Sequence, residues 1–245
     1  MRAVSTPAAF SLEAQDVQLW AAALDQPPWR LPYLLGVLSD DERARADRFV
    51  FERDRRHFVV ARAFLRLLLG RYLGADPSRI VLAYGPRGKP SLGGERADAA
   101  LQFNVAHSHG VALYAFTYRR AIGVDVELVR HLEDMVQLAR LVCSPRELTV
   151  FLALPPEQQA NWFFKMWTRK EAIVKATGDG LAQPLQELDV SSPPGDFGTS
   201  VSLGGTCARP ALVRWTVRDV TAVPGYAAAI AVEGPVERLT YQRWE

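Results

Sequence analysis

The stretch "GVALYAFTY" (110–118) indicates how this chain is organised, because "GYAAAIAVE" (225–233) repeats its pattern of a leading glycine followed by small and apolar residues. Each stretch is typical of a core strand, and each follows a region with helical periodicity. Together they predict an α+β fold made of two similar halves, each of which runs strand, helices, strands. We place the halves at 1–120 and 121–245. Chance similarity between two core strands is the alternative.

The segments around these two stretches alternate between strand-like and helical patterns. Ser39 and Glu42 have the spacing of a capping box, and apolar residues then recur at helical spacing up to the glycines near residue 74. Residues 131–177 are also mostly helical in pattern, whereas 191–206 are rich in turn residues. Strand patterns are found at 16–25, 79–85, 101–118, 121–129, 211–220 and 225–233.

The composition excludes several classes of protein. Of the 245 residues 49% are hydrophobic and the net charge is +2, which suits a large core and argues against a dedicated nucleic-acid-binding protein. Cys143 and Cys207 are too few for a disulfide framework and lack the spacing of a zinc site. The first residues have no apolar signal-like run, and no uncharged apolar run approaches the roughly 18 residues of a membrane span. We expect a cytoplasmic protein with no membrane partner.

In "IGVDVE" (122–127), apolar residues alternate with Gly123, Asp125 and Glu127. On a strand this pattern places both carboxylates on one face, roughly 6.5 to 7 Å apart along the backbone. Two carboxylates at that separation can converge on one Mg²⁺, which typically takes one or two carboxylates together with substrate phosphates. The alternative is an edge strand with a solvated acidic face.

The segment 162–177 is predicted to be a helix with a wide arc of large apolar side chains. Lys170 lies near the middle of this arc, and Glu171 lies within it. Because such groups are seldom buried unless they are paired or liganded, the helix is predicted to present charge toward the core side. Lys175 lies one turn beyond Glu171 and can support it. The alternative is an ordinary surface Glu171–Lys175 pair with Lys170 extended toward solvent.

Three further features suit contact with phosphate, although each has a common structural explanation. His107 and His109 in "FNVAHSHG" (103–110) share one strand face, where a hydrogen-bonded structural histidine is the usual finding. "RGKP" (87–90) places two cations at a turn, but it is too short for a phosphate-binding P-loop and also suits a plain hairpin turn. Arg45 lies near a helix start, among arginines that nearby acids can pair.

Taken in chain order, "RGKP", "FNVAHS", "GVDVE" and "WTRKEAIVKATGDGL" (167–181) resemble the motifs of the 4′-phosphopantetheinyl transferases, specifically the large, surfactin-synthetase-activating type. The resemblance implies a pseudo-twofold monomer with coenzyme A and Mg²⁺ bound between two α+β halves. It also implies transfer of the 4′-phosphopantetheine arm of coenzyme A to a serine of an acyl, peptidyl or polyketide carrier protein, often in secondary metabolism. Adenosine 3′,5′-bisphosphate would be released.

The same resemblance implies roles for individual residues. Asp125, Glu127 and Glu171 would hold Mg²⁺, with Mn²⁺ as an alternative ion. Glu171 and Lys175 would be catalytic, and Glu171 is open to the role of metal ligand, general base or both. Coenzyme A would be bound by eight residues: Arg45, Arg87, Gly88, Lys89, Pro90, His107, Lys170 and Lys175.

Two positions depart from the family pattern. Ala106 stands where the histidine motif commonly has a serine, so one hydroxyl contact to phosphate would be lost. Glu42 stands where some relatives carry a basic residue, which leaves open which cations bind the 3′-phosphate.

Two other functions use similar residues. Metal-dependent nucleases also combine clustered acids with a lysine, but their E-x-K spacing is absent here and the near-neutral charge disfavours them. A non-catalytic coenzyme A-binding or carrier-binding module is the second alternative. All three acidic positions are present, so the sequence favours the enzyme.

Overall fold

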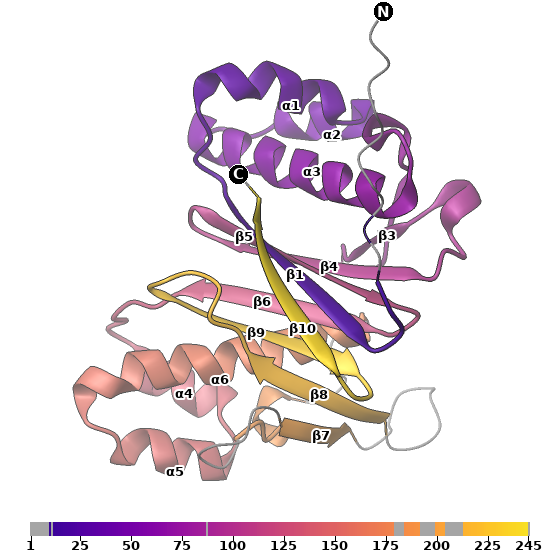
Figure 1. Ribbon diagram of the computed structural model, residues 1–245. Coiled ribbons are helices and arrows are strands. Elements are labelled where there is room, and N and C mark those ends of the chain that lie inside the picture. The colour runs from indigo at the N-terminus through magenta and orange to yellow at the C-terminus, as the bar shows by residue number, and fades with distance from the viewer. Residues whose placement is uncertain are drawn as a thin grey trace, which may run out of the picture.

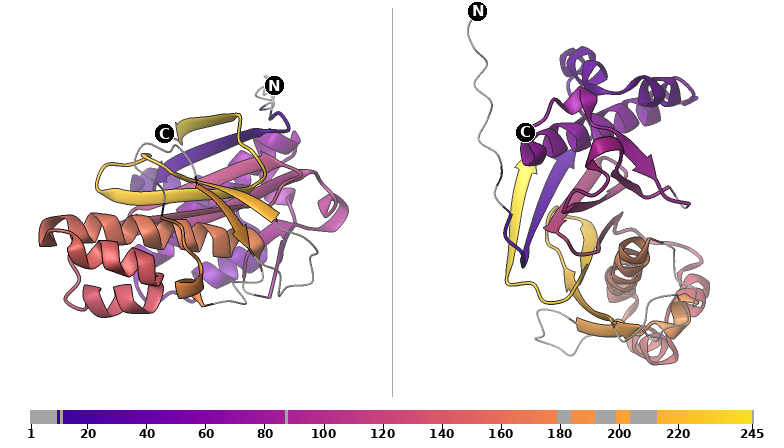
Figure 2. Two further views of the ribbon diagram at one scale, coloured as in Figure 1. Left: turned by 90° about the horizontal axis from the view of Figure 1, so that it is seen from below. Right: turned by 90° about the vertical axis from the view of Figure 1, so that its right-hand side faces the viewer.

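Two sheets that face each other form the centre of the molecule, and helices cover the outer face of each sheet (Figures 1 and 2). The structure is a computed structural model that describes residues 10, 12–86, 88–178, 184–191, 199–203 and 213–244, with the backbone alone at 199–203 and 213. Within this part of the chain the layers run helices, sheet, sheet, helices. The α+β class predicted from the sequence is confirmed.

Among the described residues, the two large sheets have four strands each. The first has the order β10-β1-β5-β4 and consists of β1 (Asp16–Ala23), β4 (Leu101–Ser108), β5 (Val111–Tyr118) and β10 (Arg238–Trp244). The second has the order β6-β9-β8-β7 and consists of β6 (Ile122–Leu128), β7 (Thr199–Leu203), β8 (Val213–Asp219) and β9 (Tyr226–Glu233). A short hairpin is formed by β2 (Leu82–Tyr84) and β3 (Pro90–Leu92).

In the part of the chain that the structure describes, three α-helices accompany each sheet. The first sheet is covered by α1 (Leu31–Val37), α2 (Asp40–Ala46) and α3 (Glu52–Leu73), and the second by α4 (Met135–Val142), α5 (Pro145–Ala153) and α6 (Pro156–Thr177). The capping box predicted at Ser39 and Glu42 begins α2, and Gly74 ends α3 in the left-handed conformation with φ 58°. Such a φ favours glycine, which explains why the helix stops there.

The two halves share one topology, as the repeated glycine-led strands predict. In each half the first strand, β1 or β6, pairs antiparallel with a later strand, β5 or β9, which contains the repeated stretch. The long helix of each half, α3 or α6, has 22 residues. The pseudo-twofold arrangement is therefore present in the structure.

The C-terminal strand crosses the boundary that we placed at residue 120. β10 pairs in parallel with β1, so the sheet of the first half is completed by the end of the second. The sequence pattern also missed β3, and it predicted turns where β7 lies. In the remaining places the predicted strands overlap observed ones.

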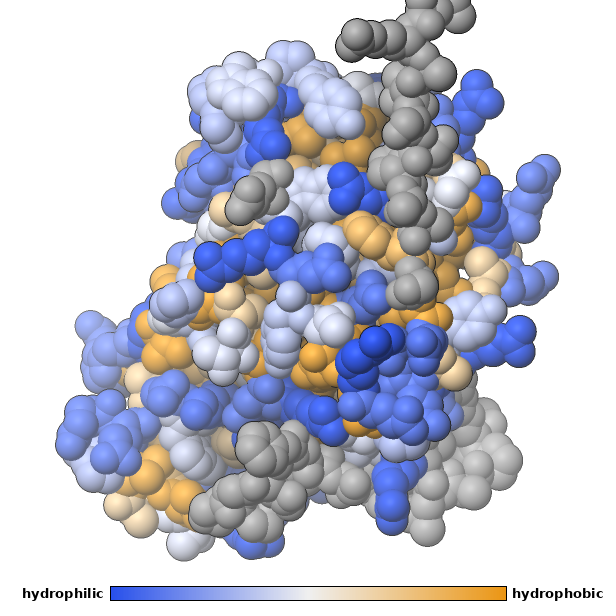
Figure 3. All heavy atoms as spheres, in the orientation of Figure 1, coloured by the Kyte–Doolittle hydropathy of each residue, from blue (hydrophilic) through white to orange (hydrophobic). Residues whose placement is uncertain are grey.

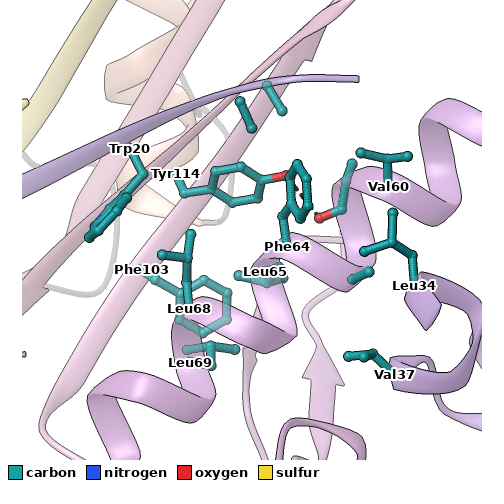
Figure 4. Close-up of a cluster of buried hydrophobic side chains, with 14 of the residues drawn as sticks. Trp20, Leu34, Val37, Val60, Phe64, Leu65, Leu68, Leu69, Phe103 and Tyr114 are labelled. Carbon is teal, nitrogen blue, oxygen red and sulfur yellow. Dashed lines mark hydrogen bonds between the residues drawn. The ribbon is translucent and has the colours of Figure 1, made fainter. Parts of the chain in front are cut away.

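Separate apolar cores lie between the layers. Between α3 and the first sheet, large side chains from both elements interlock, and Figure 4 shows Phe64 and Leu68 of α3 packed toward Phe103 and Tyr114. The Tyr114 hydroxyl donates to the carbonyl of Ala61 at 2.9 Å, so its polar atom is satisfied inside this core. A second core joins the two sheets, and a third lies between α6 and the second sheet.

Gly123 of β6 allows α6 to lie directly against the strand. A Cβ at this position would come within 1.9 Å of the Ala172 carbonyl oxygen and 2.5 Å of the Ala176 nitrogen, both backbone atoms of α6. No side-chain adjustment can relieve such a contact. The glycine therefore sets how closely the helix approaches the strand.

Gly123→Ala is expected to lower the free energy of unfolding by about 3 kcal/mol, because the helix backbone would have to move away from β6. Chemical denaturation of both proteins measures the difference. Gly36→Ala is the matched control, since a Cβ at this exposed helical position meets nothing within 4 Å. We expect the control to be neutral or slightly stabilising. Equal stability of the Gly123 variant and the wild type would contradict the close approach.

On the face that carries β10, hydrophilic and apolar residues are intermixed over the surface (Figure 3). None of the described helices combines the length and the apolar character that crossing a lipid bilayer requires.

Candidate active site

Asp125 is a buried carboxylate on β6. Its neighbours Val124 and Val126 point into the core between the sheets, so the alternation of the strand turns Asp125 toward α6, where it is 3% exposed. Burial raises the pKa of Asp125 to about 7; Lys175 opposes this rise, and the charges of Glu127 and Glu171 add to it. Although β6 is an edge strand, Asp125 does not belong to a solvated acidic face.

Glu127 lies two residues further along the same face and is held by the first half of the chain. The Ser108 hydroxyl at the end of β4 donates to Glu127 Oε2 at 2.7 Å and accepts from the Leu128 backbone nitrogen at 3.3 Å. Asn104 on β4 likewise accepts from the Val124 nitrogen at 2.9 Å. Side chains of β4 therefore fix the acidic strand where the two halves meet.

Glu171 and Lys175 come to this place from α6. Lys175 Nζ donates to Asp125 Oδ1 at 2.6 Å, so the ammonium reaches across to β6. Burial raises the pKa of Glu171, Lys175 opposes the rise, and the charge of Glu127 contributes to it. The carboxylates of Asp125, Glu127 and Glu171 and the ammonium of Lys175 thus form one cluster of interacting charges. The alternative, an ordinary surface pair of Glu171 and Lys175, does not fit this arrangement.

Lys170 is not part of this cluster, which corrects its predicted contact with coenzyme A. The residue is fully buried, and its ammonium lies 2.6 Å from Glu147 Oε2 of α5. Lys170 Nζ also donates to three backbone carbonyls, those of Val142, Leu185 and Leu188, at 2.7 to 2.8 Å. With these partners the ammonium is engaged inside the protein and has no access to a ligand.

A cavity of about 760 Å³ lies beside the acidic cluster, lined by α3, β4 and the turn before β3. Four of the predicted coenzyme A residues reach it: Arg45, Gly88, Pro90 and His107. Arg87 lies outside the described residues. The lining also includes Arg53, Arg62, His57 and His109, so three arginines and three histidines line the cavity together with Asp25 and Asp54. Its size is within the usual range for small-molecule sites.

The cavity walls hold cations over aromatic rings. Arg45 lies 5.2 Å from the Phe58 ring centroid, and Arg62 lies 5.2 Å from that of Tyr84, whose hydroxyl accepts from Arg62 at 3.0 Å. The surrounding walls remove hydration from the His107 ring, and Lys175 and Arg62 add positive charge, so the pKa of His107 is lowered. Since Lys175 also contacts Asp125, His107 connects the cavity with the acidic cluster.

Lys89 joins the β2–β3 turn to the second half of the chain. Its ammonium donates to the carbonyls of Ile122 at 3.2 Å and Ala176 at 3.1 Å, and burial lowers the pKa of Lys89 to about 8. In this structure the side chain therefore bridges the ends of β6 and α6. Contact between Lys89 and a phosphate stays a prediction.

Comparison with known proteins identifies the family. The family model described as the 4′-phosphopantetheinyl transferase superfamily matches residues 121–231, and that of the 4′-phosphopantetheinyl transferase N-terminal region matches 24–117. The 4′-phosphopantetheinyl transferase HetI of a Nostoc species is 39% identical over 232 residues, which cover 93% of this chain and 92% of that protein. The chain belongs to the 4′-phosphopantetheinyl transferase family.

Two further relatives agree with this assignment. A putative 4′-phosphopantetheinyl transferase of a Synechocystis species is 34% identical over 70% of this chain and 68% of its own. The 4′-phosphopantetheinyl transferase Sfp of Bacillus subtilis is 27% identical over 64% of this chain and 67% of its own. This transferase is thus an enzyme that moves the phosphopantetheine arm of coenzyme A, its substrate, to carrier proteins.

Several residues around the site of the transferase were not singled out in the sequence. Ser108 lies between His107 and His109 and no motif marks it, yet its hydroxyl orients Glu127. Arg62 and His57 lie five residues apart on α3, where their pattern is that of ordinary polar surface residues. Arg62 and His57 are each next to a residue that packs in the first core, Ala61 and Phe58, which places their side chains at the rim of that core.

Proposed function

We propose that this transferase binds coenzyme A in the cationic cavity and a divalent metal ion at Asp125, Glu127 and Glu171, where the arm of coenzyme A passes to a carrier serine. The observation that carries the proposal is the buried Asp125 carboxylate. Oδ1 meets the Lys175 ammonium, whereas Oδ2 is buried with no hydrogen-bond partner. Burying a carboxylate oxygen without a partner destabilises the folded protein unless a cation binds to that oxygen.

The chemistry of the acidic cluster fits a hard divalent ion. Its carboxylate oxygens are the ligands that Mg²⁺ and Mn²⁺ prefer. No three acidic, histidine or cysteine side chains among the described residues are placed to enclose a metal on their own. Mg²⁺ does not require such an enclosure, since it commonly uses one or two carboxylates and takes its other ligands from water and substrate phosphate. We propose Mg²⁺ as the ion and Mn²⁺ as its substitute.

The cations around the cavity suit a polyphosphate ligand. Arg45 and His107 line the cavity, as do Gly88 and Pro90 of the turn before β3, and Lys175 contacts Asp125 and adds positive charge near His107. We propose that Arg45 meets the phosphate near the adenosine and that His107 and Lys175 meet the pyrophosphate. Positive charge held in place before the reaction favours the charge that builds up on the departing phosphate.

We assign Glu171 as both metal ligand and general base. In the metal-free protein burial raises the pKa of Glu171, which favours uptake of the serine proton, and a bound cation would oppose that rise. The serine oxygen then bonds to the phosphorus next to pantetheine, and the bond from that phosphorus to the bridging oxygen breaks. Adenosine 3′,5′-bisphosphate departs, and Lys175 neutralises its charge. A bound divalent metal would supply charge neutralisation and alignment of the phosphates.

The partners we propose are acyl, peptidyl or polyketide carrier proteins, including those of secondary metabolism, and we propose that the enzyme acts as a monomer in the cytoplasm. The pairing of two similar halves within one chain supports the monomer, because the acidic strand of one half is already held by β4 of the other. A non-catalytic module is not favoured, since the relatives named above are transferases.

We expect the purified enzyme, coenzyme A and Mg²⁺ to add one phosphopantetheine to an apo carrier protein, measured as the intact mass of the carrier. EDTA should abolish the gain in mass, and excess Mg²⁺ should restore it. A carrier whose acceptor serine is replaced by alanine is the control and should gain nothing. If no acyl or peptidyl carrier is modified while coenzyme A still binds, the catalytic proposal is wrong.

Binding of coenzyme A is expected to be coupled to proton uptake by His107. With its lowered pKa the free imidazole is mostly neutral at pH 7, and a neighbouring polyphosphate raises its pKa. The affinity contributed by His107 should therefore weaken as the pH rises from 6 to 8. Calorimetry in buffers of different ionisation enthalpy measures the proton uptake directly.

His107→Gln should abolish this part of the proton uptake, whereas His131→Gln should leave it unchanged, because His131 is exposed on the loop after β6. The comparison between the two variants removes the contribution of phosphate groups that titrate in the same range. Identical proton uptake by wild type and His107→Gln would remove His107 from the binding site.

A further inference from the structure

The two halves contain the same buried ion-pair arrangement. In the first half, Glu42 of α2 lies 2.5 Å from Arg66 of α3; in the second, Glu147 of α5 lies 2.6 Å from Lys170 of α6. Each of the four side chains is at most 2% exposed. We call these pairs the N-terminal anchor (Glu42–Arg66) and the C-terminal anchor (Glu147–Lys170).

The acidic partners of the two anchors hold the same place in their helices, although Glu147 Oε1 also accepts from the Val190 nitrogen at 2.8 Å and Glu42 Oε1 has no hydrogen-bond partner. Each glutamate is the third residue of its helix and forms a capping box with the serine before the helix, Ser39 or Ser144. Glu147 accepts from the Ser144 nitrogen at 2.8 Å, and Glu42 accepts from the Ser39 nitrogen at 3.3 Å. One carboxylate thus caps a short helix and receives a buried cation at the same time.

The cationic partners also correspond. Arg66 and Lys170 each occupy the fifteenth position of a 22-residue helix. Each also donates to a short 3-10 turn that follows its helix: Arg66 to the carbonyls of Pro77 at 3.0 Å and Ile80 at 2.9 Å, and Lys170 to those of Leu185 at 2.8 Å and Leu188 at 2.7 Å. Each anchor therefore ties a short helix, a long helix and the following turn together.

Stability alone is a weak explanation for a buried ion pair, since replacing both partners with apolar residues is often neutral or stabilising. A buried ion pair can instead fix the orientation of the helices that carry its two partners. Lys170 is held by four oxygen atoms from three segments, which defines both the rotation of α6 and its position along its own axis. Gly123 defines only how closely the helix approaches β6.

The helices held in this way carry different parts of the site. Glu171 follows Lys170 directly and is turned about 100° from it around α6, toward the acidic strand, with Lys175 one turn further. On α3, one turn before Arg66, Arg62 lines the cavity, and Arg62 Nε lies 3.9 Å from Glu42 Oε1. A small rotation of α6 would displace the acidic cluster, whereas a rotation of α3 would displace the cavity wall.

We propose that the anchors are positioning devices with separate tasks: the C-terminal anchor aligns Glu171 and Lys175 with Asp125, and the N-terminal anchor aligns the wall that receives coenzyme A. This inference rests on the proposed function for the identity of the ligands. It makes Glu42, Arg66, Glu147 and Lys170 positioning residues, because all four are buried within the protein and act through the helices that carry them.

The test uses two matched double variants of the full chain, Glu147→Gln/Lys170→Met and Glu42→Gln/Arg66→Met. Glutamine can retain the capping box through its amide oxygen, but at position 147 it cannot also accept from the Val190 nitrogen as Glu147 Oε1 does at 2.8 Å, so that bond is removed together with the ion pair and the cation. Thermal unfolding establishes that each variant is folded at the assay temperature. Transfer to an apo carrier then gives kcat, the KM for coenzyme A and the Mg²⁺ concentration for half-maximal rate.

The C-terminal variant is expected to have a kcat about tenfold lower and to need about tenfold more Mg²⁺, with a KM for coenzyme A near that of the wild type. The N-terminal variant is expected to show the reverse, with a KM for coenzyme A about tenfold higher and an unchanged Mg²⁺ requirement. Calorimetric titrations of coenzyme A without metal, and of Mg²⁺ in the presence of coenzyme A, should show the same separation without any turnover.

A purely structural role predicts a different result. Both variants would then lose thermal stability, and kinetic constants would be unchanged or altered alike, which would overturn the inference. Should a double variant fail to fold, the single variants Glu147→Gln and Glu42→Gln keep each cation bonded and are compared in the same way. If the wild-type enzyme transfers nothing, the proposed function fails, and the two calorimetric titrations still decide whether the anchors act separately.

Discussion

Asp125→Asn is expected to reduce kcat/KM for carrier modification by about three orders of magnitude, because the charge that meets Lys175 and would hold the metal is removed. The amide has nearly the same shape as the carboxylate, so the strand should keep its place. Steady-state kinetics at saturating Mg²⁺ measure the loss. Raising Mg²⁺ should not restore the rate, since the ligand itself has changed.

The same substitution is not expected to destabilise the metal-free protein at pH 8. The pKa of Asp125 is raised from 3.8 to about 7 in the folded state, mainly by burial. A group with a raised folded pKa stabilises most below its unfolded pKa, and that stabilisation is lost as the pH rises through the folded value. Above pH 7 the buried charge is therefore a net cost, which asparagine avoids.

This combination of outcomes separates function from folding. Activity should fall steeply, while the free energy of unfolding at pH 8 stays equal or rises, as is found where a site keeps an unfavourable group for its chemistry. Asp219→Asn is the matched control, because Asp219 accepts from Arg169 on another side of α6, at 2.6 and 2.8 Å. Full activity of Asp125→Asn would exclude Asp125 from the site, whereas equal losses in both variants would indicate a general disturbance of α6.

Lys170→Met is expected to lower the free energy of unfolding by roughly 3 to 5 kcal/mol, since it leaves the Glu147 carboxylate buried without its cation. The three carbonyls that accept from Lys170 lose their donor as well. In a chain of this size the thermal midpoint should fall by roughly 6 to 20 °C. Chemical and thermal denaturation provide the measurement.

The double variant Glu147→Gln/Lys170→Met supplies the control for this result. Because it removes both charges, it should recover a large part of the stability that Lys170→Met loses. Adding the single variant Glu147→Gln completes a double-mutant cycle, which gives the coupling energy of the pair. A double variant that is no more stable than Lys170→Met would mean that the carbonyl contacts, and not the ion pair, account for the effect.

The sequence predicted the acidic strand correctly because the two-residue period of a strand is a local property. Val124 and Val126 had to share one face, so Asp125 had to lie on the other. The helical period of 162–177 was equally informative about which side of α6 is apolar. It did not reveal what packs there, and the partner of Lys170 lies 23 positions earlier in the sequence, at the start of another helix.

Long-range pairing explains the other differences. β10 has mixed polarity and is largely exposed, so its pattern carries little signal, and Arg238 pairs with Asp16 across 222 residues. Ser108 is an unremarkable residue in a strand until β4 and β6 are placed side by side. Such contacts form only when the two halves are packed together. Motif spacing describes each segment by itself and therefore could not predict them.

The pairing of β10 with β1 has a consequence for synthesis of the chain. β1 is among the first segments to leave the ribosome, and at usual translation rates β10 follows roughly 10 to 40 s later. Until then, one edge of β1 lacks its native neighbour, and an open strand edge can pair with other chains. The last described strand thus closes the first sheet, so nascent chains that stop short of residue 238 would be exposed to misassembly and would depend on chaperones.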